Sequence, residues 1–336
     1  MARRPRKDRF TTTPSRIEVN VRAIPLLPPN GWRLCTLEEL PLVGAVPKNY
    51  LAYGDPRSPE TLGYIAKKGR MKADARECVT EEIISKIGAM LPVEMARSKL
   101  IRISKHDVRF LSQNFVVHGQ YELLHGIELV ARYFQTNPSE VESAFELGDR
   151  KREQNFYTVE NILTILNSLY PNDFLVLKEG FFKMLAFDAF IGAPDRHGMN
   201  WGVLAPLVNS RPIRFSPIFD TARGLFREYS DADLIKKAKQ QGRECFLENY
   251  ANRSRPIFST GQAQPDNHFS LAKWVSAQHP NTCRNTMCRV FNAVDLPSIE
   301  RMLQRRFRRI ITQDRIGFIR DLLALRIKRL RQEVRV

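Results

Sequence analysis

The sequence has few cysteines and no long apolar stretch. Its 336 residues include five cysteines, an odd and sparse number that does not fit a disulfide scaffold and indicates reduced thiols. No apolar run reaches the roughly eighteen residues that a membrane helix requires. The basic start of the chain leads into threonine-rich sequence, unlike a secretory signal. We therefore expect no membrane span and a cytoplasmic protein.

Several familiar active-site motifs are also missing. The sequence contains no G-x-x-x-x-G-K-[ST] phosphate loop, no G-x-S-x-G nucleophile elbow and no H-E-x-x-H metal site. Cys283 and Cys288 lie close in sequence, but no second Cys or His pair lies at zinc-finger spacing, so we expect no cysteine-bound metal. These absences argue against the common P-loop nucleotide enzymes, serine hydrolases and zinc proteases.

Basic residues are in large excess. The formal net charge is +17, and the positive charge is concentrated in Arg3–Arg9 and in the arginine-rich stretch from Arg301 to Arg331. Such a field attracts polyanions, so RNA, a tRNA-carrying protein or an acidic protein are candidate partners for these basic ends. A solvated helix face that aids solubility explains the same charges, and charge alone does not choose between these interpretations.

The first third of the chain predicts strands around one helix. Residues 1–30 read as a basic N-terminal arm with irregular, proline-containing sequence. Tyr50–Lys68 predicts a hairpin with a turn rich in glycine and proline. A helix capped by Thr80 follows, and then two strands are expected over Leu100–Ile103 and Val108–Val117.

Beyond residue 118 the apolar periodicity becomes helical. We expect helices over Tyr121–Phe134, Val159–Leu169 and Phe174–Ile191, and a basic amphipathic segment from Ile299 to Arg331. A strand-rich lobe over residues 31–117 is thus followed by a helical lobe over residues 118–336. That order predicts an α+β, two-lobed protein-kinase-like fold.

A group of chemically suitable residues follows the most apolar helix. Asp195 and Asn200 stand five apart on a glycine-containing loop, and a short apolar strand over Phe215–Phe219 leads into Asp220. One carboxylate can receive a proton from a substrate hydroxyl, while an amide oxygen and a second carboxylate can hold Mg²⁺. The bare pattern is common by chance, but the buried helix and the strand before it give it weight as a phosphoryl-transfer site.

Two segments around these residues resemble the core of the HipA-like kinases. They are Asp195–Gly202, which reads DRHGMNWG, and Pro217–Leu225, which reads PIFDTARGL. The family consists of bacterial serine/threonine kinases, several of them toxins of toxin–antitoxin modules. The likeness is specific over residues 180–228 and looser over residues 60–135. It implies a small strand-rich N-lobe that binds ATP, a larger helical C-lobe, ATP with Mg²⁺, a protein substrate with a serine or threonine, and an antitoxin-like partner.

The resemblance also implies roles for residues of the C-lobe. Asp195 would be the catalytic base, while Asn200 and Asp220 would bind the metal and, through it, the nucleotide. His197 has two interpretations, as a hydrogen-bonding brace for the loop or as a second acid–base group. Arg196 and Arg223 could pair with loop carboxylates or with a phosphorylated residue.

In the N-lobe, the resemblance implies a lysine for the ATP phosphates. Lys67 ends the second strand of the hairpin at the expected place, with Lys68 as its rival. Glu81 would be the ion-pair partner of this lysine, and Glu82 is a close alternative. Without the downstream motif, these residues would be read as solvated ends of a strand and a helix.

Three departures from the family pattern bear on these roles. Ala193 stands where relatives often carry asparagine. The turn of the hairpin is not a glycine-rich G-x-G-x-x-G loop, so backbone and side chains from Gly54 to Ser58 would cover the phosphates. Ser58 is also a candidate autophosphorylation site, although an ordinary turn serine explains it as well. The front of the chain is too short for the extra N-terminal subdomain of the longer toxins, which predicts a compact form.

Two other functions stay open at the level of sequence. Kinases of lipids or small molecules carry a similar D-R-H-x-x-N loop, although no apolar membrane-binding stretch supports a lipid substrate. A catalytically silent pseudokinase that binds polyanions is the third interpretation. Such a protein would be expected to lose Lys67, Asp195, Asn200 or Asp220, and the sequence retains all four.

Overall fold

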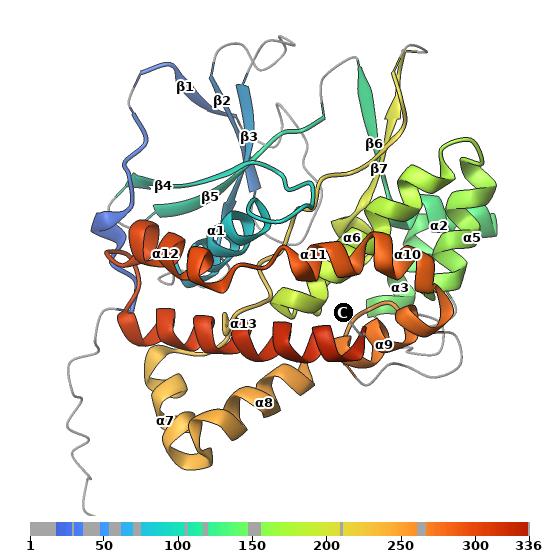
Figure 1. Cartoon of the computed structure of the whole chain (residues 1–336). Coiled ribbons are helices and arrows are strands. Elements are labelled where there is room, and N and C mark those ends of the chain that lie inside the picture. Colours follow the sequence, from blue (N-terminus) through green and yellow to red (C-terminus); the bar gives the residue numbers. More distant parts are fainter. Residues whose placement is uncertain are drawn as a thin grey trace, which may run out of the picture.

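A five-stranded antiparallel sheet and one helix form the N-lobe (Figure 1). The computed structural model describes residues 18–28, 30–35, 48–53, 62–69, 75–104, 107–116, 120–146, 156–208, 211–260 and 267–334. The strands lie in the order β1-β2-β3-β5-β4, and α1 packs against β4 and β5. Their bounds are β1 Trp32–Cys35, β2 Lys48–Tyr53, β3 Leu62–Lys68, α1 Arg76–Gly88, β4 Ser98–Ser104 and β5 Asp107–Gln113.

The expected strands of the hairpin and the two following strands are present, although β5 ends at Gln113 and not at the expected Val117. β2 pairs with β3 in antiparallel register, with Tyr50 opposite Ile65, and β4 pairs with β5. Alternation along the strands separates two faces of the sheet. Tyr64, Ala66 and Leu111 lie in a small cluster on one face, whereas Phe110 belongs to the main core that includes α1. Lys67 is the register partner of Phe110, so its side chain points to the α1 face.

The predicted helix of the N-lobe exists, but Thr80 does not cap it. α1 begins at Arg76, and Thr80 is buried within it. The residue before the helix, Ala75, makes no side-chain cap, and packing of the buried residues Val79, Ile83 and Ile84 against the sheet stabilises the helix instead. The earlier start places a full turn before Glu81, which therefore lies well inside the helix.

The C-lobe is helical, with a small three-stranded sheet of order β6-β7-β8. At its centre lies α6, whose residues from Phe181 to Ile191 are almost all buried. Within the described ranges, no helix combines the length and apolar character that a membrane crossing requires. The elements are β6 Tyr121–His125, α2 Gly126–Phe134, α3 Pro138–Glu146, α5 Val159–Leu169, α6 Phe174–Ile191, β7 Gly202–Pro206, β8 Arg214–Phe215, α7 Asp231–Gln241, α8 Arg243–Arg253, α9 His268–Gln278, α10 Pro280–Asn285, α11 Met287–Asn292, α12 Leu296–Phe307 and α13 Gln313–Glu333.

The helices expected over Val159–Leu169 and Phe174–Ile191 are confirmed, but two other expectations were wrong. The first five residues of Tyr121–Phe134 form β6, because their backbone pairs with the distant β7 from Tyr121 opposite Pro206 to His125 opposite Gly202. The strand expected over Phe215–Phe219 ends at Phe215, where β8 stops, and Ile218 forms an isolated bridge with Met95 instead.

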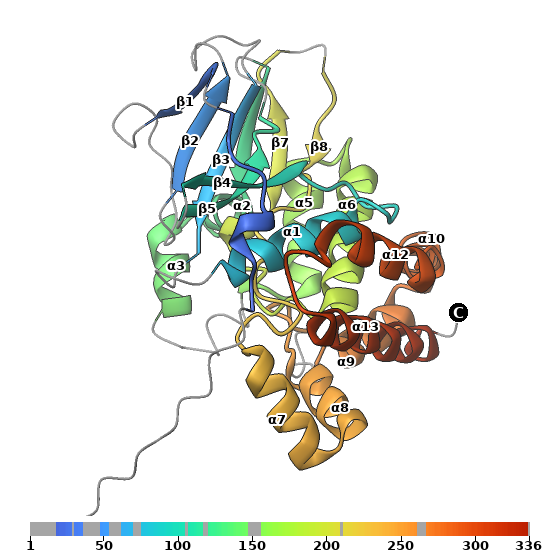
Figure 2. The same cartoon turned by 90° about the vertical axis from the view of Figure 1, so that its left-hand side faces the viewer.

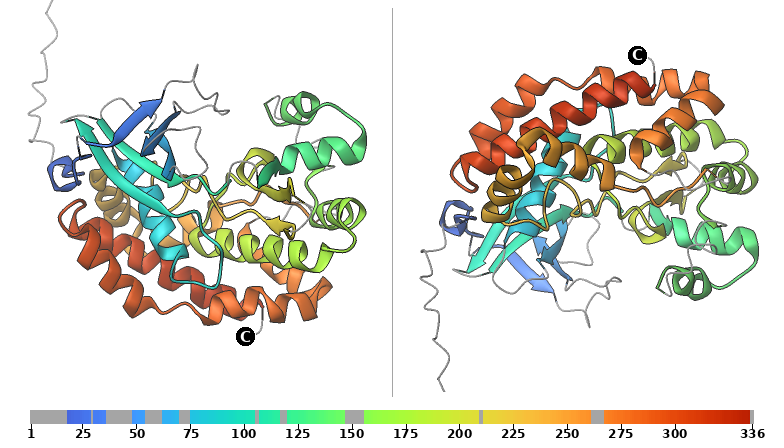
Figure 3. Two further views of the ribbon diagram at one scale, coloured as in Figure 1. Left: turned by 90° about the horizontal axis from the view of Figure 1, so that it is seen from above. Right: turned by 90° about the horizontal axis from the view of Figure 1, so that it is seen from below.

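The basic segment from Ile299 to Arg331 is not one continuous element. It divides into α12 and α13, and Thr312 caps the second helix by accepting a hydrogen bond from the backbone of Arg315. Figure 3 shows the C-terminal helices along one side of the molecule, where they run beside both lobes.

The chain before β1 crosses from one lobe to the other. Asn20 donates a backbone hydrogen bond of 2.7 Å to Ile310 of the C-lobe, and Leu27 donates one of 2.9 Å to Arg102 of β4. The short 3₁₀ helix η1, Val21–Ala23, lies between these two contacts (Figure 2). A second connection joins the lobes where Ala96 donates to the carbonyl of Ile218 at 3.0 Å. Backbone bonds therefore fix the lobes on both sides of the site described next.

Candidate active site

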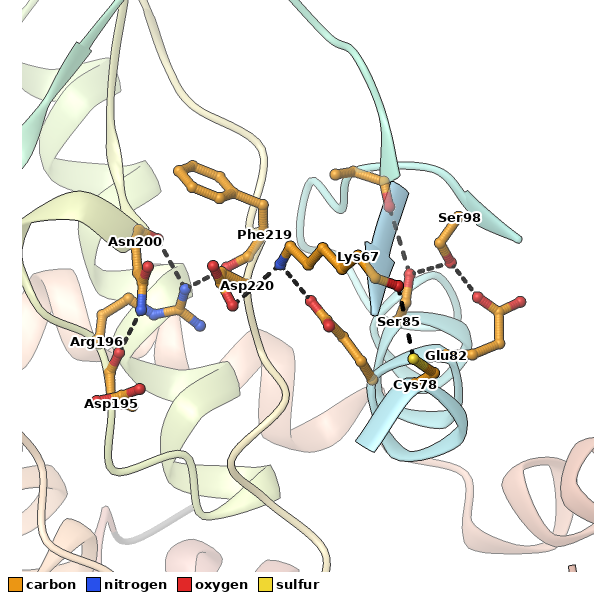
Figure 4. Close-up of polar contacts among 12 residues, drawn as sticks. Lys67, Cys78, Glu82, Ser85, Ser98, Asp195, Arg196, Asn200, Phe219 and Asp220 are labelled. Atoms are coloured by element: carbon orange, nitrogen blue, oxygen red, sulfur yellow. Dashed lines mark hydrogen bonds and ion pairs between the residues drawn. The ribbon is translucent and has the colours of Figure 1, made fainter. Parts of the chain in front are cut away.

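Lys67 lies at the centre of a charge cluster between the lobes. Its Nζ is 3.0 Å from Asp220 Oδ1 in the C-lobe (Figure 4). The same atom is 2.8 Å from Glu81 Oε1 on α1. The register of β3 aims Lys67 toward α1, and the side chain is almost fully buried. Lys68 points the other way, with its more exposed Nζ 3.9 Å from Asp107. Geometry therefore brings Lys67, and not Lys68, to Glu81 and Asp220.

Geometry also distinguishes Glu81 from Glu82 as the partner of Lys67. Glu82 accepts a 2.7 Å hydrogen bond from Ser98 and pairs with Lys86 at 3.1 Å, which ties α1 to β4 within the N-lobe. Glu81 is the residue that reaches Lys67. Because the two glutamates are adjacent on α1, they point in different directions, one toward the C-lobe and one toward the sheet edge.

Burial and neighbouring charges shift the pKa values of Lys67 and Glu81 in opposite directions. Burial lowers the pKa of Lys67, but the carboxylates of Glu81 and Asp220 outweigh it, and the net pKa is raised. Burial raises the pKa of Glu81 to about 7, although the charge of Lys67 opposes the rise. Lys67 is therefore a fixed cation that a second negative group, such as a phosphate, would find already oriented.

The loop after α6 carries Asp195, His197 and Asn200. Asn200 Nδ2 donates a 2.7 Å hydrogen bond to the carbonyl of Asp195 and lies 3.2 Å from His197 Nε2. The backbone N–H of Met199 donates to His197 Nδ1 at 3.3 Å. Burial lowers the pKa of His197, so the imidazole is held in its neutral form, and its Nδ1 accepts the hydrogen bond from Met199. This geometry favours the bracing interpretation of His197.

Arg196 joins three parts of the C-lobe. Its guanidinium binds both carboxylate oxygens of Asp188 on α6, at 2.8 Å and 2.7 Å. The same group donates to the carbonyl of Asn200 at 2.8 Å and to that of Phe219 at 2.7 Å. The arginine is buried, so these contacts are protected from solvent. Arg196 thus brings the loop of Asn200 beside the segment that leads into Asp220.

Asn200 and Asp220 are suited to a Mg²⁺ ion. Both offer hard oxygen ligands, and the amide oxygen of Asn200 has no hydrogen-bond partner among the described residues. Asp220 adopts a left-handed backbone conformation with φ of 52°. Aspartate tolerates this region better than most residues, and such conformations are frequent at functional sites. Among the described residues, no group of three or more His, Cys, Asp and Glu side chains is placed to hold a metal ion.

Arg223 forms an ion pair with Asp195. Its Nε lies 2.9 Å from Asp195 Oδ2, and the arginine side chain is 41% exposed. The contact orients the carboxylate that the sequence motif marks as the base. Because the guanidinium is open to solvent, a substrate or phosphate group can approach it.

Side chains from the C-terminal helices hold the start of the loop. Arg326 of α13 donates to the carbonyls of Ala189, at 2.6 Å, and Phe190, at 3.1 Å, at the end of α6. Ser254 donates to the carbonyl of Gly192 at 2.8 Å, and His268 Nε2 lies 3.0 Å from that of Ala193. The last carbonyls of a helix lack partners within the helix, so these contacts satisfy them and fix where the loop begins.

The sequence missed these supporting residues, and two of its candidates cannot be placed. Gly54 and Ser58 lie outside the described residues. Asp188 carried one signal, as the single acidic residue among the buried positions of α6, whereas Arg326 lay in a segment read only as basic and amphipathic. Cys283 and Cys288 have sulfur atoms 3.9 Å apart beside a hollow of about 620 Å³ lined by α9, α10, α11 and α13, away from this site.

Comparisons with known proteins agree with this architecture. Residues 40–294 match the HipA-like C-terminal domain family. The serine/threonine-protein kinase CtkA of Helicobacter pylori is 21% identical over 230 residues, which cover 67% of this chain and 63% of that kinase. The matched part thus spans less than two thirds of the curated relative.

Solved structures show the same fold. The crystal structure of the Helicobacter pylori proinflammatory kinase CtkA superposes with a TM-score of 0.66 at 18% identity, covering 86% of this chain and 95% of that one. HipA from Shewanella oneidensis, in a complex with HipB and operator DNA, gives a TM-score of 0.50 at 12% identity over 91% of this chain and 73% of that one. The fold is therefore α+β, two-lobed and protein-kinase-like. The chain belongs to the HipA-like C-terminal domain family.

Proposed function

We propose that this protein is an ATP- and Mg²⁺-dependent serine/threonine protein kinase of the HipA-like type. The observation that carries the proposal is Lys67 Nζ held between Glu81 of the N-lobe and Asp220 of the C-lobe, at 2.8 Å and 3.0 Å. A lysine paired with a glutamate on the N-lobe helix and lying beside a metal-binding aspartate is the arrangement that kinases use to orient ATP phosphates.

The residues divide the work of phosphoryl transfer between the lobes. Lys67 would bind the phosphates, and Glu81 would keep its ammonium in place. Asn200 and Asp220 would hold Mg²⁺, which would neutralise charge on the phosphates and help to orient them. Such a site relies on orientation and electrostatics more than on covalent chemistry.

Asp195 would act as the base toward the substrate hydroxyl. Its carboxylate lies on the loop after α6, in which Arg196 donates to the carbonyl of Asn200 and Asn200 donates to that of Asp195. Arg223, beside it, would approach the transferred phosphate as the carboxylate accepts the proton. A protein serine or threonine is the proposed acceptor because a named serine/threonine kinase, CtkA, shares sequence and fold with this chain.

Two further aspects are part of the proposal. The HipA relative is found with HipB and operator DNA, which supports an antitoxin-like protein partner for this chain. Ser58 remains the proposed site of autophosphorylation, since it lies in the sequence between β2 and β3, where the phosphates would be covered.

The test is transfer of label from radioactive ATP in the presence of Mg²⁺. Purified full-length protein would be incubated with a generic protein substrate and analysed by autoradiography and phosphosite mapping, beside Asp195→Ala. Label on wild type alone supports the kinase, and mapping shows whether Ser58 is modified. If wild type binds ATP but labels only a lipid or small molecule, the substrate class is wrong. If it neither binds ATP nor transfers phosphate, the kinase proposal fails.

A further inference from the structure

A row of arginines lies on the outward surface of α12 and of the turn that follows it. Five arginines occur within residues 301–309, and all of them are exposed, whereas Ile299, Leu303 and Phe307 of the same helix are buried. The helix is therefore held to the core by one face and presents positive charge on the other. The set, called here the α12 arginine surface, consists of Arg301, Arg305, Arg306, Arg308 and Arg309.

The charges of this surface are only partly offset within the described part of the chain, because Asp295 interacts with Arg301, and Glu82 with Arg306, without forming an ion pair. None of the five arginines forms an ion pair there. Glu300 is the acidic residue of α12, and it pairs with Arg320 of α13 at 3.1 Å. Arg301 donates a hydrogen bond to Ser298, a neutral group. Exposed arginines usually gain little from an ion pair, but five unpaired ones side by side create a strong local positive potential.

Three of these arginines form a regular row. Arg301, Arg305 and Arg308 are spaced by four and three residues, so they share one face of the helix, with rises of about 6 Å and 4.5 Å between them. They border one shallow hollow of about 620 Å³ together with Pro297, Glu300 and Gln304. A row of guanidinium groups at such intervals suits a partner whose negative charges also repeat at short, regular intervals.

The basic N-terminal sequence joins the molecule at the same corner. Val19 forms a bridge with Ile311, and Asn20 donates to the carbonyl of Ile310, directly after Arg309. The sequence that precedes this point includes Arg3, Arg4, Arg6, Lys7 and Arg9, which lie outside the described residues. Val19 and Asn20 thus lie beside the residues that follow α12, although about three hundred residues separate the two segments in the chain.

The character of the surface distinguishes between kinds of polyanion. A protein partner usually requires exposed apolar or aromatic anchors, and single-stranded nucleic acid usually stacks its bases on aromatic rings. Among the described residues, the exposed large apolar side chains lie on other elements, and none is on α12, α13 or the turn between them. What the surface offers is phosphate binding without base contacts, which is how proteins bind duplexes independently of sequence.

We propose that the α12 arginine surface binds the phosphate backbone of double-stranded nucleic acid, independently of base sequence. The surface lies on the C-terminal layer of helices, and none of its residues belongs to the Lys67–Asp220 site (Figures 1 and 3). Binding there would hold the protein on a duplex and leave the phosphoryl-transfer site accessible. The inference does not depend on kinase activity.

The test measures binding of full-length protein to a short fluorescein-labelled DNA duplex by fluorescence anisotropy over a series of salt concentrations. The variant carries Arg301→Ala, Arg305→Ala and Arg308→Ala. The control carries Lys236→Ala, Lys239→Ala and Arg253→Ala, which removes from α7 and α8 three exposed positive charges that form no ion pair with another described residue. Both variants should fold, because all six side chains are exposed, and thermal melting checks this.

The logarithm of the affinity falls with the logarithm of the salt concentration. Loss of three phosphate contacts should make this negative slope shallower by about two to three in the α12 variant. The control should retain a slope close to that of wild type. An equal loss in both variants would show only a general charge effect and would overturn the proposed site. Wild-type protein that fails to bind the duplex, or that binds the single strand or polyglutamate more tightly, would overturn the proposed ligand.

Discussion

Lys67 on β3 and Asp220 in the second lobe form an ion pair of 3.0 Å, which directly connects the two lobes. The same ammonium is held from the other side by Glu81 at 2.8 Å. Three charged residues from three separate parts of the sequence therefore meet where neither lobe alone would complete a site. Backbone bonds on either side, through Asn20 and Ala96, hold the lobes in this relation.

Glu81→Gln and Glu82→Gln should have different effects. Glu81 orients Lys67, so its loss should reduce phosphoryl transfer by roughly a hundredfold while the protein remains folded. Glu82 binds Ser98 and Lys86 within the N-lobe, so its loss should lower the melting temperature and leave transfer within a few-fold of wild type. Initial rates and melting curves for both variants measure this. Equal loss of activity in the two variants would contradict the assigned roles.

Asp188→Asn should strongly destabilise the protein. The substitution leaves Arg196 buried without its carboxylate partner, and breaking such a pair costs about 3–5 kcal/mol. Glu94→Gln is the matched control, because it breaks the exposed pair with Arg214 and should cost less than about 1 kcal/mol. Urea unfolding of both variants gives the free energies. A cost for Asp188→Asn no larger than that of the control would show that Arg196 is not held as described.

Local patterns predicted the elements whose hydrogen bonds are local. The helices Val159–Leu169 and Phe174–Ile191 and the hairpin of β2 and β3 agree with the structure, because periodicity and turn residues determine them. β6 was mistaken for helix because its pairing partner, β7, lies about eighty residues away in the sequence. A strand of five residues carries too little periodicity to reveal such a partner.

The site could be predicted only in part for a similar reason. The spacing of Asp195, Asn200 and Asp220 on the sequence pointed to a shared site, and the structure brings their segments together through Arg196. Side-chain direction in β3, which selects Lys67 over Lys68, depends on strand register. Asp188 and Arg326 act through contacts between distant helices, and nothing in their local sequence specifies those contacts.

Protonation of His268 should destabilise the folded state in mild acid. Burial and the charge of Arg326 hold the pKa of this imidazole well below its usual value near 6.5. The unfolded chain therefore takes up a proton that the folded protein does not, and the free energy of unfolding falls as pH drops below 6.5, by up to about 1.4 kcal/mol per pH unit for this group. His268→Gln keeps an N–H donor for Ala193 but should remove this part of the pH dependence. Urea unfolding between about pH 5 and 7 measures it. Identical pH dependence in both proteins would contradict the prediction.

Arg223→Ala should slow phosphoryl transfer while leaving ATP affinity unchanged. The guanidinium lies 2.9 Å from Asp195 and orients its carboxylate, so its loss should reduce the rate by roughly tenfold to a hundredfold. Arg223→Lys should recover part of the rate because it retains the charge. Single-turnover rates and nucleotide titrations separate the two effects. Faster transfer in Arg223→Ala would show instead that the ion pair restrains the base.

The most direct test of the account is calorimetric titration of a non-hydrolysable ATP analogue, with and without Mg²⁺, into wild type, Lys67→Met and Lys68→Met. If Lys67 and Asp220 form the nucleotide site, wild type and Lys68→Met bind the analogue in a Mg²⁺-dependent manner, and Lys67→Met loses roughly tenfold or more in affinity. Binding that is equal in all three proteins, or absent in wild type, would contradict the claim that this cluster between the lobes is an ATP site.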